Sequence, residues 1–287
     1  MADARRAAHG ADRRPPLPLF DASATLKSQT SKPGECAHER VLPRRSARHA
    51  SADAIDDPGG NRRRDMQRFR SSGFPDEWVR LVLPSENGRV TMPRLVDDRW
   101  QMPAELPRSS LRPYTVRRWN RETASITVDF VVHEGGLASD WAMKASPGDE
   151  IGVTSPQGKY APPNEAEWVL LIADATGLPA MARILEEKSC NRPFTAHIEI
   201  PGQDDIQTDL EAQCAVNWHT GFGNIPGSTR LAQIAESIRL PEGPGYIWVA
   251  GEAKATTAIR RHLHDERGVP KDFVTAIGYW IIGKPRD

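Results

Sequence analysis

The 287-residue sequence has no excess of charge of either sign, because 38 lysines and arginines balance 38 aspartates and glutamates. A dedicated nucleic-acid-binding chain carries a basic excess, so we expect no nucleic-acid partner. Three cysteines are too few for a disulfide framework or a four-cysteine zinc site. The sequence therefore predicts free thiols in a reducing compartment and no metal site.

Long apolar runs are also missing. The longest, Trp168–Ala173, is far too short to span a bilayer. Paired arginines at Arg5-Arg6 and Arg13-Arg14 are followed by no apolar stretch, so the sequence indicates neither a secretory nor a twin-arginine signal. We therefore expect a cytoplasmic, monomeric protein without a membrane partner.

Residues 1–70 differ in composition from the rest of the chain. They hold 15 basic and 9 acidic residues, a net charge of +6, while all eight tryptophans and all four tyrosines follow residue 77. Large apolar residues are too few in this segment to offset the conformational entropy lost on ordering it. We therefore predict a disordered basic tail over residues 1–70.

Residues 71–162 have the pattern of an antiparallel barrel. Apolar and polar side chains alternate along Ser125–His133, as in a half-buried strand, and Gly135-Gly136 opens a short helical stretch. The predicted strands are Trp78–Leu83, Leu111–Trp119, Ser125–His133 and Glu150–Thr154. Antiparallel strands with one short helix predict a β barrel.

Residues 163–287 alternate strands with helices, which predicts a parallel sheet with right-handed crossovers. Trp168–Ala173 is apolar on both faces, as a central parallel strand should be. The other predicted strands are Phe194–Ile200, Cys214–His219, Tyr246–Ala250 and Val274–Ile282, and the helices are Gly177–Glu187, Ser228–Ile238 and Ala253–Glu266. The predicted fold class is thus a β barrel followed by a nucleotide-binding α/β domain.

The first stretch that can carry chemistry is RPYTVR, Arg112–Arg117. Alternation along a strand places Arg112 and Tyr114 on one face and Thr115 and Arg117 on the other. A ring that stacks, a hydroxyl and a guanidinium on one strand can bind a flavin and its pyrophosphate. An ordinary amphipathic strand with surface arginines explains the same pattern, so this stretch alone leaves both interpretations open.

Three junctions between a strand and a helix can bind phosphates or nucleotides. Asp129–Trp141 places two glycines before a helix N-terminus, where N–H groups and the dipole attract anions. Asp174–Ala180 and Trp248–Ala253 follow strands at one predicted sheet edge, where doubly wound folds bind ligands. A capped helix or a tight turn accounts for each junction equally well.

In their order and spacing these segments resemble the siderophore-interacting protein family, which comprises NAD(P)H-dependent flavin ferric reductases of the ferredoxin reductase superfamily. The resemblance covers about Trp78 to Gly283. Its motifs are RPYTVR (112–117), VVHEGGLASDWA (131–142), PGDEIGVTSPQG (147–158), WVLLIADATGLPAMARILEE (168–187), WVAGEA (248–253), IRRHLHDERG (259–268) and GYWIIG (278–283).

The resemblance implies bound FAD, NADPH or NADH as electron donor, and a ferric siderophore as substrate. It assigns the following positions: Arg112, Tyr114 and Thr115 to flavin and pyrophosphate; Asp129, Val131 and His133 to adenosine; Gly136, Ala138 and Ser139 to the phosphates; Thr176, Gly177, Gly251 and Glu252 to the nicotinamide cleft; and Trp280 to the neighbourhood of the flavin. A basic rim for an anionic siderophore is a further hypothesis, with Arg80, Arg117 and Lys284 as candidates.

Two departures from the family pattern modify these expectations. The arginine expected just after Trp218-His219 is replaced by Thr220-Gly221, which weakens any contact with a 2′-phosphate. Two strands expected ahead of Trp78–Leu83 are not recognisable, so the barrel is expected to be incomplete. The expected reaction passes electrons from NAD(P)H through FAD to ferric siderophore iron and releases Fe(II). The alternatives are a flavin reductase with another acceptor and a truncated, non-catalytic paralogue.

Overall fold

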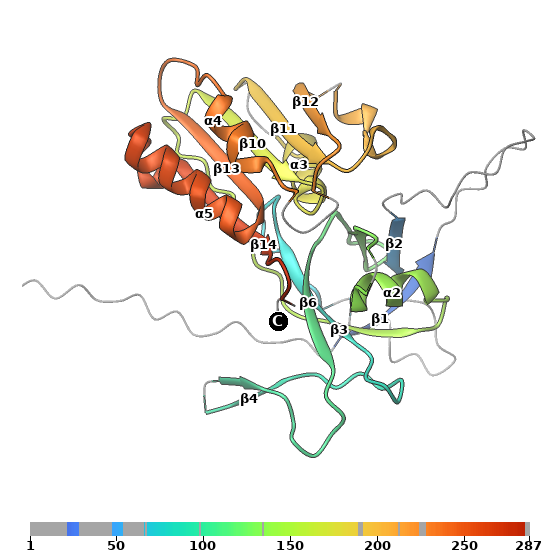
Figure 1. The fold of residues 1–287 in the computed structure, drawn as a ribbon. Coiled ribbons are helices and arrows are strands. Elements are labelled where there is room, and N and C mark those ends of the chain that lie inside the picture. The colour runs from blue at the N-terminus through green and yellow to red at the C-terminus, as the bar shows by residue number, and fades with distance from the viewer. Residues whose placement is uncertain are drawn as a thin grey trace, which may run out of the picture.

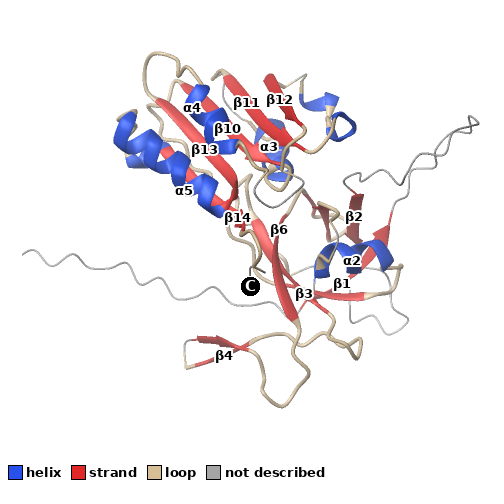
Figure 2. Ribbon diagram, in the orientation of Figure 1, coloured by secondary structure: helices blue, strands red, loops and turns tan. Residues whose placement is uncertain are grey.

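The computed structural model describes residues 22–28, 48–53, 66, 68–97, 99–133, 135–188, 192–211, 213–223 and 228–284. An antiparallel β barrel precedes an α/β domain along the chain (Figures 1 and 2). Among the described residues, no helix has both the length and the apolar character needed to cross a bilayer. The predicted fold class is confirmed.

Seven strands form the barrel in the order β6-β3-β9-β1-β2-β8-β7. Their bounds are β1 (Ala22–Ser28), β2 (Arg48–Asp53), β3 (Trp78–Leu83), β6 (Ser110–Thr115), β7 (Arg118–Asn120), β8 (Ser125–Phe130) and β9 (Glu150–Val153). The stretch from β6 to β7 bends at Val116 and Arg117, whose amides donate to Glu77 and Thr127 respectively. Because β6 pairs with β3 and β7 pairs with β8, this bent strand closes the sheet on itself.

The structure corrects the sequence analysis at β1 and β2. Both strands fall within residues 1–70, where a disordered tail was predicted, and they pair with each other between β9 and β8. They supply the two strands whose apparent absence suggested an incomplete barrel. Leu26 is the only large apolar residue in either strand, so alternation gives no signal there and ladder hydrogen bonding on both sides compensates. The rest of that predicted tail up to residue 65 lies outside the described residues.

Apolar side chains of β3, β8 and β9 fill the barrel, and helix α2 (Leu137–Lys144) packs on it through Ala138. Met66 and Phe69 are also part of this core, ahead of the first strand predicted from the sequence. A small hairpin, β4 (Arg94–Val96) and β5 (Arg99–Gln101), projects from the long connection between β3 and β6 (Figure 1).

The α/β domain is built on a five-stranded parallel sheet in the order β12-β11-β10-β13-β14. The strands are β10 (Trp168–Asp174), β11 (Phe194–Ile200), β12 (Ala215–Thr220), β13 (Gly245–Glu252) and β14 (Val274–Trp280); the helices are α3 (Leu178–Glu186), α4 (Leu231–Ser237) and α5 (Ala253–Arg261). Short turns of helix follow at η1 (Gln203–Asp205), η2 (Thr208–Leu210), η3 (His262–Glu266) and η4 (Lys271–Phe273).

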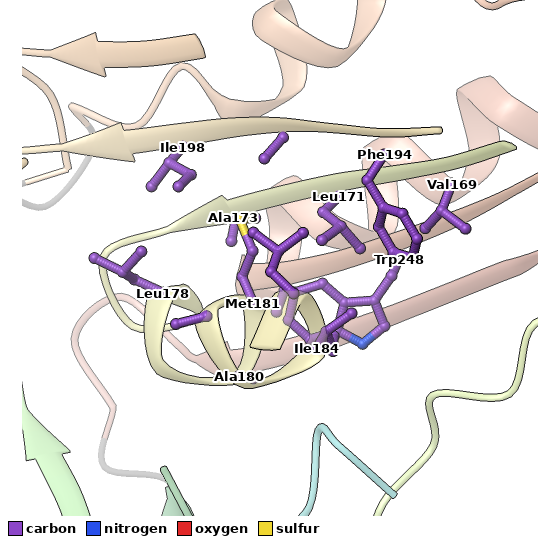
Figure 3. Packing of buried hydrophobic residues seen from close by; sticks show 14 of the residues in the cluster. Val169, Leu171, Ala173, Leu178, Ala180, Met181, Ile184, Phe194, Ile198 and Trp248 are labelled. Carbon is purple, nitrogen blue, oxygen red and sulfur yellow. The ribbon is translucent and has the colours of Figure 1, made fainter. Parts of the chain in front are cut away.

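Both faces of this sheet are covered, which explains why β10 and β13 are buried at every position. On one face, α3 packs Met181 and Ile184 against Leu171 and Trp248 (Figure 3). On the other, α4 and α5 cover Leu170, Ile172 and their neighbours. The order of the strands reverses at β10, so the crevice outside the carboxyl ends of β10 and β13 is the expected ligand site of a doubly wound sheet.

Candidate functional site

The barrel and the α/β domain are joined by a buried ion pair. Glu77 lies just before β3 and is fully buried, and its Oε1 accepts a hydrogen bond from Nη1 of Arg183 on α3 at 2.8 Å. The same guanidinium nitrogen donates to the carbonyl of Val116 at 2.8 Å. Val116 follows Thr115 directly, so α3 is fixed to the strand that carries the predicted flavin motif.

A second ion pair lies beside the first. Arg117, only 5% exposed, donates to the Glu186 carboxylate at the end of α3 and lies 3.9 Å from Asp129 of β8. The hydrogen bond from Arg117 lowers the pKa of Glu186. The structure therefore places Arg117 and Asp129 in a buried electrostatic contact between the domains. We no longer include Arg117 among the candidates for a basic substrate rim.

Asp76 forms a third connection between the two domains. Its carboxylate is buried and accepts hydrogen bonds from the amides of Lys159 and Tyr160 at 2.8 and 2.9 Å. Its other oxygen accepts from Nε1 of Trp248, in the middle of β13, at 3.1 Å. The sequence analysis missed Asp76, Glu77 and Arg183. Two features of the sequence could have indicated these buried polar groups: the acidic pair directly before a strand, and the single arginine within an otherwise apolar helix.

The predicted flavin strand alternates as expected. Arg112 and Tyr114 pair in register with Leu81 and Val79, which puts both on the same face of the barrel, and Thr115 is on the other. The ring of Tyr114 lies 4.5 Å from that of Phe130. Burial raises the pKa of Tyr114 to about 12, against the opposing effect of Arg112. The hydroxyl therefore stays protonated and can donate a hydrogen bond at any physiological pH.

Gly136 forms a close backbone turn before α2. A Cβ atom there would lie 2.4 Å from Cε1 of His133 and 2.5 Å from Oγ of Ser139, so any other residue would force one of these side chains to move. Ser139 Oγ donates to the carbonyls of His133 and Gly136, and Gly136 offers no side chain to cap the first turn. Val131 leads into this turn from β8, and Ala138 is buried under it. This turn suits a phosphate group approaching the helix N-terminus.

At the crevice of the α/β sheet, Asp174 ties the ends of three strands together. Its Oδ1 accepts hydrogen bonds from the amide and hydroxyl of Thr176, and its Oδ2 accepts from the Glu252 amide and from Nε1 of Trp280 at 3.0 and 2.7 Å. Burial raises the pKa of Asp174, although these hydrogen bonds oppose the shift. Thr176, Glu252 and Trp280, predicted from separate motifs, are thus brought together around one carboxylate.

Two glycines and one unpartnered oxygen lie at the carboxyl ends of β10 and β13. A Cβ at Gly177 would lie 2.8 Å from Cβ of Ala173, and one at Gly251 would lie 2.6 Å from Oδ2 of Asp174. Glu252 caps α5 by accepting from two amides through Oε2, whereas its buried Oε1 has no partner among the described residues. The two glycines therefore let the chain pack closely on itself at this edge. The unpartnered Oε1 of Glu252 is an acceptor that a ligand with its own hydrogen-bond donor, such as a carboxamide, can satisfy.

The two remaining basic candidates, Arg80 on β3 and Lys284 after β14, are both exposed. Across the ranges that the structure describes, no group of three or more histidine, cysteine, aspartate or glutamate side chains is arranged to hold a metal ion.

A pair of histidines lies on the neighbouring strands β11 and β12. Nδ1 of His197 lies 3.2 Å from Nε2 of His219, with nearly parallel rings, so one ring donates to the other. Burial, followed by the proximity of His219, lowers the pKa of His197 to about 4, and burial also lowers the pKa of His219.

This histidine pair predicts an acid-sensitive contribution to stability. A histidine whose folded pKa is below its unfolded value stabilises the fold fully above about pH 6.5, and that stability is lost as the pH falls towards 4. Between pH 7 and pH 5 the free energy of unfolding should fall by roughly 1 kcal/mol more in the wild type than in His197→Gln, after allowance for the partial exposure of His197. Urea unfolding at the two pH values measures this difference, and equal losses would contradict the assignment.

The fold is the two-domain FAD- and NAD-binding architecture of the ferredoxin reductase type. A barrel carries the aromatic strand and the glycine turn, and a doubly wound domain places its ligand crevice at β10 and β13. Three polar links, two of them buried and the third half-buried, hold the two parts together.

Comparison with known proteins identifies the family. The profile of the siderophore-interacting FAD-binding domain matches residues 62–160, and that of the siderophore-interacting protein matches residues 166–283. The NADPH-dependent ferric-chelate reductase of Escherichia coli is 30% identical over 220 residues, which cover 75% of this chain and 83% of the reductase. The chain belongs to the siderophore-interacting protein family.

Further similarities agree with this assignment. The ferric vibriobactin reductase ViuB of Vibrio cholerae is 29% identical over 224 residues, covering 74% of this chain and 80% of ViuB. The crystal structure of a siderophore utilization protein from T. fusca has a TM-score of 0.73 and 31% identity, covering 94% of this chain and 97% of that one. The predicted family, with FAD and NAD(P)H as its cofactors, is therefore confirmed.

Proposed function

We propose that this protein passes electrons from NAD(P)H through FAD to a ferric siderophore and releases Fe(II) in the cytoplasm. The proposal is supported by the contact of Arg183 with Val116, which fixes α3, next to the proposed nicotinamide site, to the strand that we propose binds the flavin. The named relatives are reductases of ferric chelates and of ferric vibriobactin. With β1 and β2 in the barrel, the reason for considering a truncated paralogue is removed.

The residues present fit the two cofactors in different ways. Tyr114 and Thr115 would contact the flavin, and the turn at Gly136 would hold phosphate, because Gly136 has no side chain of its own to cap the first turn of α2. Glu252 would orient the carboxamide of the nicotinamide through its unpartnered Oε1. When bound, FAD accepts a hydride and returns single electrons to ferric iron, so the chain supplies orientation rather than an acid or a base.

Arg80 and Lys284 are the exposed cations that we assign to an anionic ferric siderophore. Ferrous iron is held less tightly by hard oxygen ligands than ferric iron, so reduction favours its release.

The test is to purify the full chain, measure its flavin content, and follow NADPH oxidation with a ferric siderophore while a ferrous chelator traps the product. We expect bound FAD and stoichiometric trapped Fe(II). Reduction of quinones or free flavin but not of ferric siderophores would favour the alternative acceptor. Absence of flavin after reconstitution would reject the reductase assignment altogether.

Gly136→Ala should weaken FAD binding about tenfold, because the added methyl overpacks the turn by roughly 1–3 kcal/mol. Equilibrium titration with FAD measures the change. The matched control is Gly202→Ala, whose Cβ would have only Asp205 Oδ2 nearby, at 3.7 Å, and which should bind FAD as the wild type does. Unchanged FAD affinity in Gly136→Ala would remove this turn from the proposed phosphate site.

A further inference from the structure

The loop after β12 lacks the arginine that the family pattern has after Trp218-His219, but the structure brings another cation to the same edge of the sheet. Arg230 immediately precedes α4, and its guanidinium carbon lies 4.1 Å from the centroid of the Phe222 ring. Arg230 is exposed, while Phe222 is partly buried. At this distance the ring attracts the cation and holds its plane.

The backbone on both sides of this contact is fixed. The Gly223 amide donates to Oγ of Ser228 at 3.0 Å, and Thr229 donates to the Glu199 carboxylate at 2.7 Å. The amide of Arg230 also donates to Glu199, which is fully buried at the end of β11. The Glu199 carboxylate already accepts from Thr229 and from the Arg230 amide, and the charge of Arg230 attracts it. Among the described residues, however, the Arg230 guanidinium itself makes no hydrogen bond or ion pair.

The position of Arg230 relative to the nicotinamide crevice is set by the sheet. The carboxyl ends of β10, β11 and β12 lie side by side in parallel register. Two strand spacings separate β10 from β12, about 10 Å. A dinucleotide whose nicotinamide end lies at Thr176 and Gly177 can therefore extend along this edge, away from β13, and bring its adenosine ribose to the loops after β11 and β12.

We propose that Arg230, held over Phe222, binds the 2′-phosphate of NADPH and gives this enzyme its preference for NADPH over NADH. The inference rests on the proposed function, in which this crevice takes the nicotinamide. Arginine is permanently charged and presents paired N–H donors that match phosphate oxygens. Stacking on Phe222 occupies the face of the guanidinium and leaves these donors at its edge available. Arg230 thus replaces the arginine missing from the loop after His219.

The test compares adenosine 2′,5′-bisphosphate with 5′-AMP, by isothermal titration into the FAD-loaded full chain at one ionic strength. The wild type should bind the bisphosphate about tenfold or more tightly than AMP, because a charge-assisted contact to phosphate is of that size. Arg230→Gln should remove this preference and leave AMP affinity within about twofold. Phe222→Leu should reduce the preference partly, since the guanidinium loses its stacking partner.

Arg239→Gln is the matched control, because Arg239 is an exposed arginine beyond the other end of α4 and should change neither affinity. The inference is overturned if the wild type does not distinguish the two nucleotides, or if Arg230→Gln weakens both equally or neither. Flavin content and NADH oxidation, measured on the same samples, distinguish a wrong role for Arg230 from a wrong assignment as a reductase. Retained FAD and NADH oxidation without bisphosphate preference would reject Arg230 alone, whereas absence of both flavin and nucleotide binding would reject the reductase as well.

Discussion

Arg183→Met should destabilise the protein by about 3–5 kcal/mol, the loss typical when one partner of a buried ion pair is removed. The carboxylate of Glu77 is fully buried and, among the described residues, would keep only its hydrogen bonds from Ser71 and Ser72. The carbonyl of Val116 would also lose its donor. The free energy of unfolding in urea, followed by tryptophan fluorescence, measures the effect.

Two companion variants make this prediction specific. Arg94→Met breaks an exposed pair with Glu105, whose side chains are 63% and 64% exposed, and should cost no more than about 0.5 kcal/mol. Glu77→Gln combined with Arg183→Met should recover part of the loss, because no buried charge is then left unpaired. A loss below about 1 kcal/mol in Arg183→Met would show that the pair between the domains is not a major source of stability.

Asp174→Ala is the second large effect that we expect. It would leave the amides of Thr176 and Glu252 and the indole N–H of Trp280 without their acceptor. A buried donor left unsatisfied costs about 1–3 kcal/mol and a half-buried one less, so the total for one buried and two half-buried donors should be about 3 kcal/mol. Because the three donors belong to the ends of β10, β13 and β14, we also expect weaker NADPH binding. Urea unfolding and NADPH titration of the FAD-loaded enzyme measure the two effects.

Asp174→Asn separates the charge from the hydrogen bonds. Burial raises the pKa of Asp174 in the folded state above its unfolded value. The contribution of Asp174 to the free energy of unfolding is therefore fully present below about pH 4 and is lost as the pH rises through the raised pKa. Asp174→Asn should lack this part of the pH dependence while keeping one acceptor oxygen. If Asp174→Ala is as stable as the wild type and binds NADPH normally, Asp174 does not organise the crevice.

The sequence was sufficient for those parts of the fold with a strong local pattern. The apolar run at β10 predicts a central parallel strand, and the motifs ending β10 and β13 do meet at one edge. Alternation in the strand of Tyr114 is also as predicted.

What could not be predicted depends on contacts between distant residues. Arg183 and Glu77 are 106 residues apart, and nothing near either one indicates the other. The sequence pattern around Arg117 is that of an exposed cation on a strand. Its burial depends on the ion pair with Glu186 at the end of α3, which is distant in sequence. The strand β1 has little apolar character of its own and depends on pairing with β9.

That pairing has a consequence for how the protein is made. Ala22 lies opposite Val153, and the strand that bends at Val116 joins the two ends of the sheet. The ring cannot close on the ribosome until the chain has grown past Val153, because β1 has no partner on its second side before β9 is made, whereas β2 can already pair with β8. Contacts so distant in sequence slow folding. The nascent barrel therefore has open strand edges during most of its synthesis, the state in which such chains are most prone to aggregate.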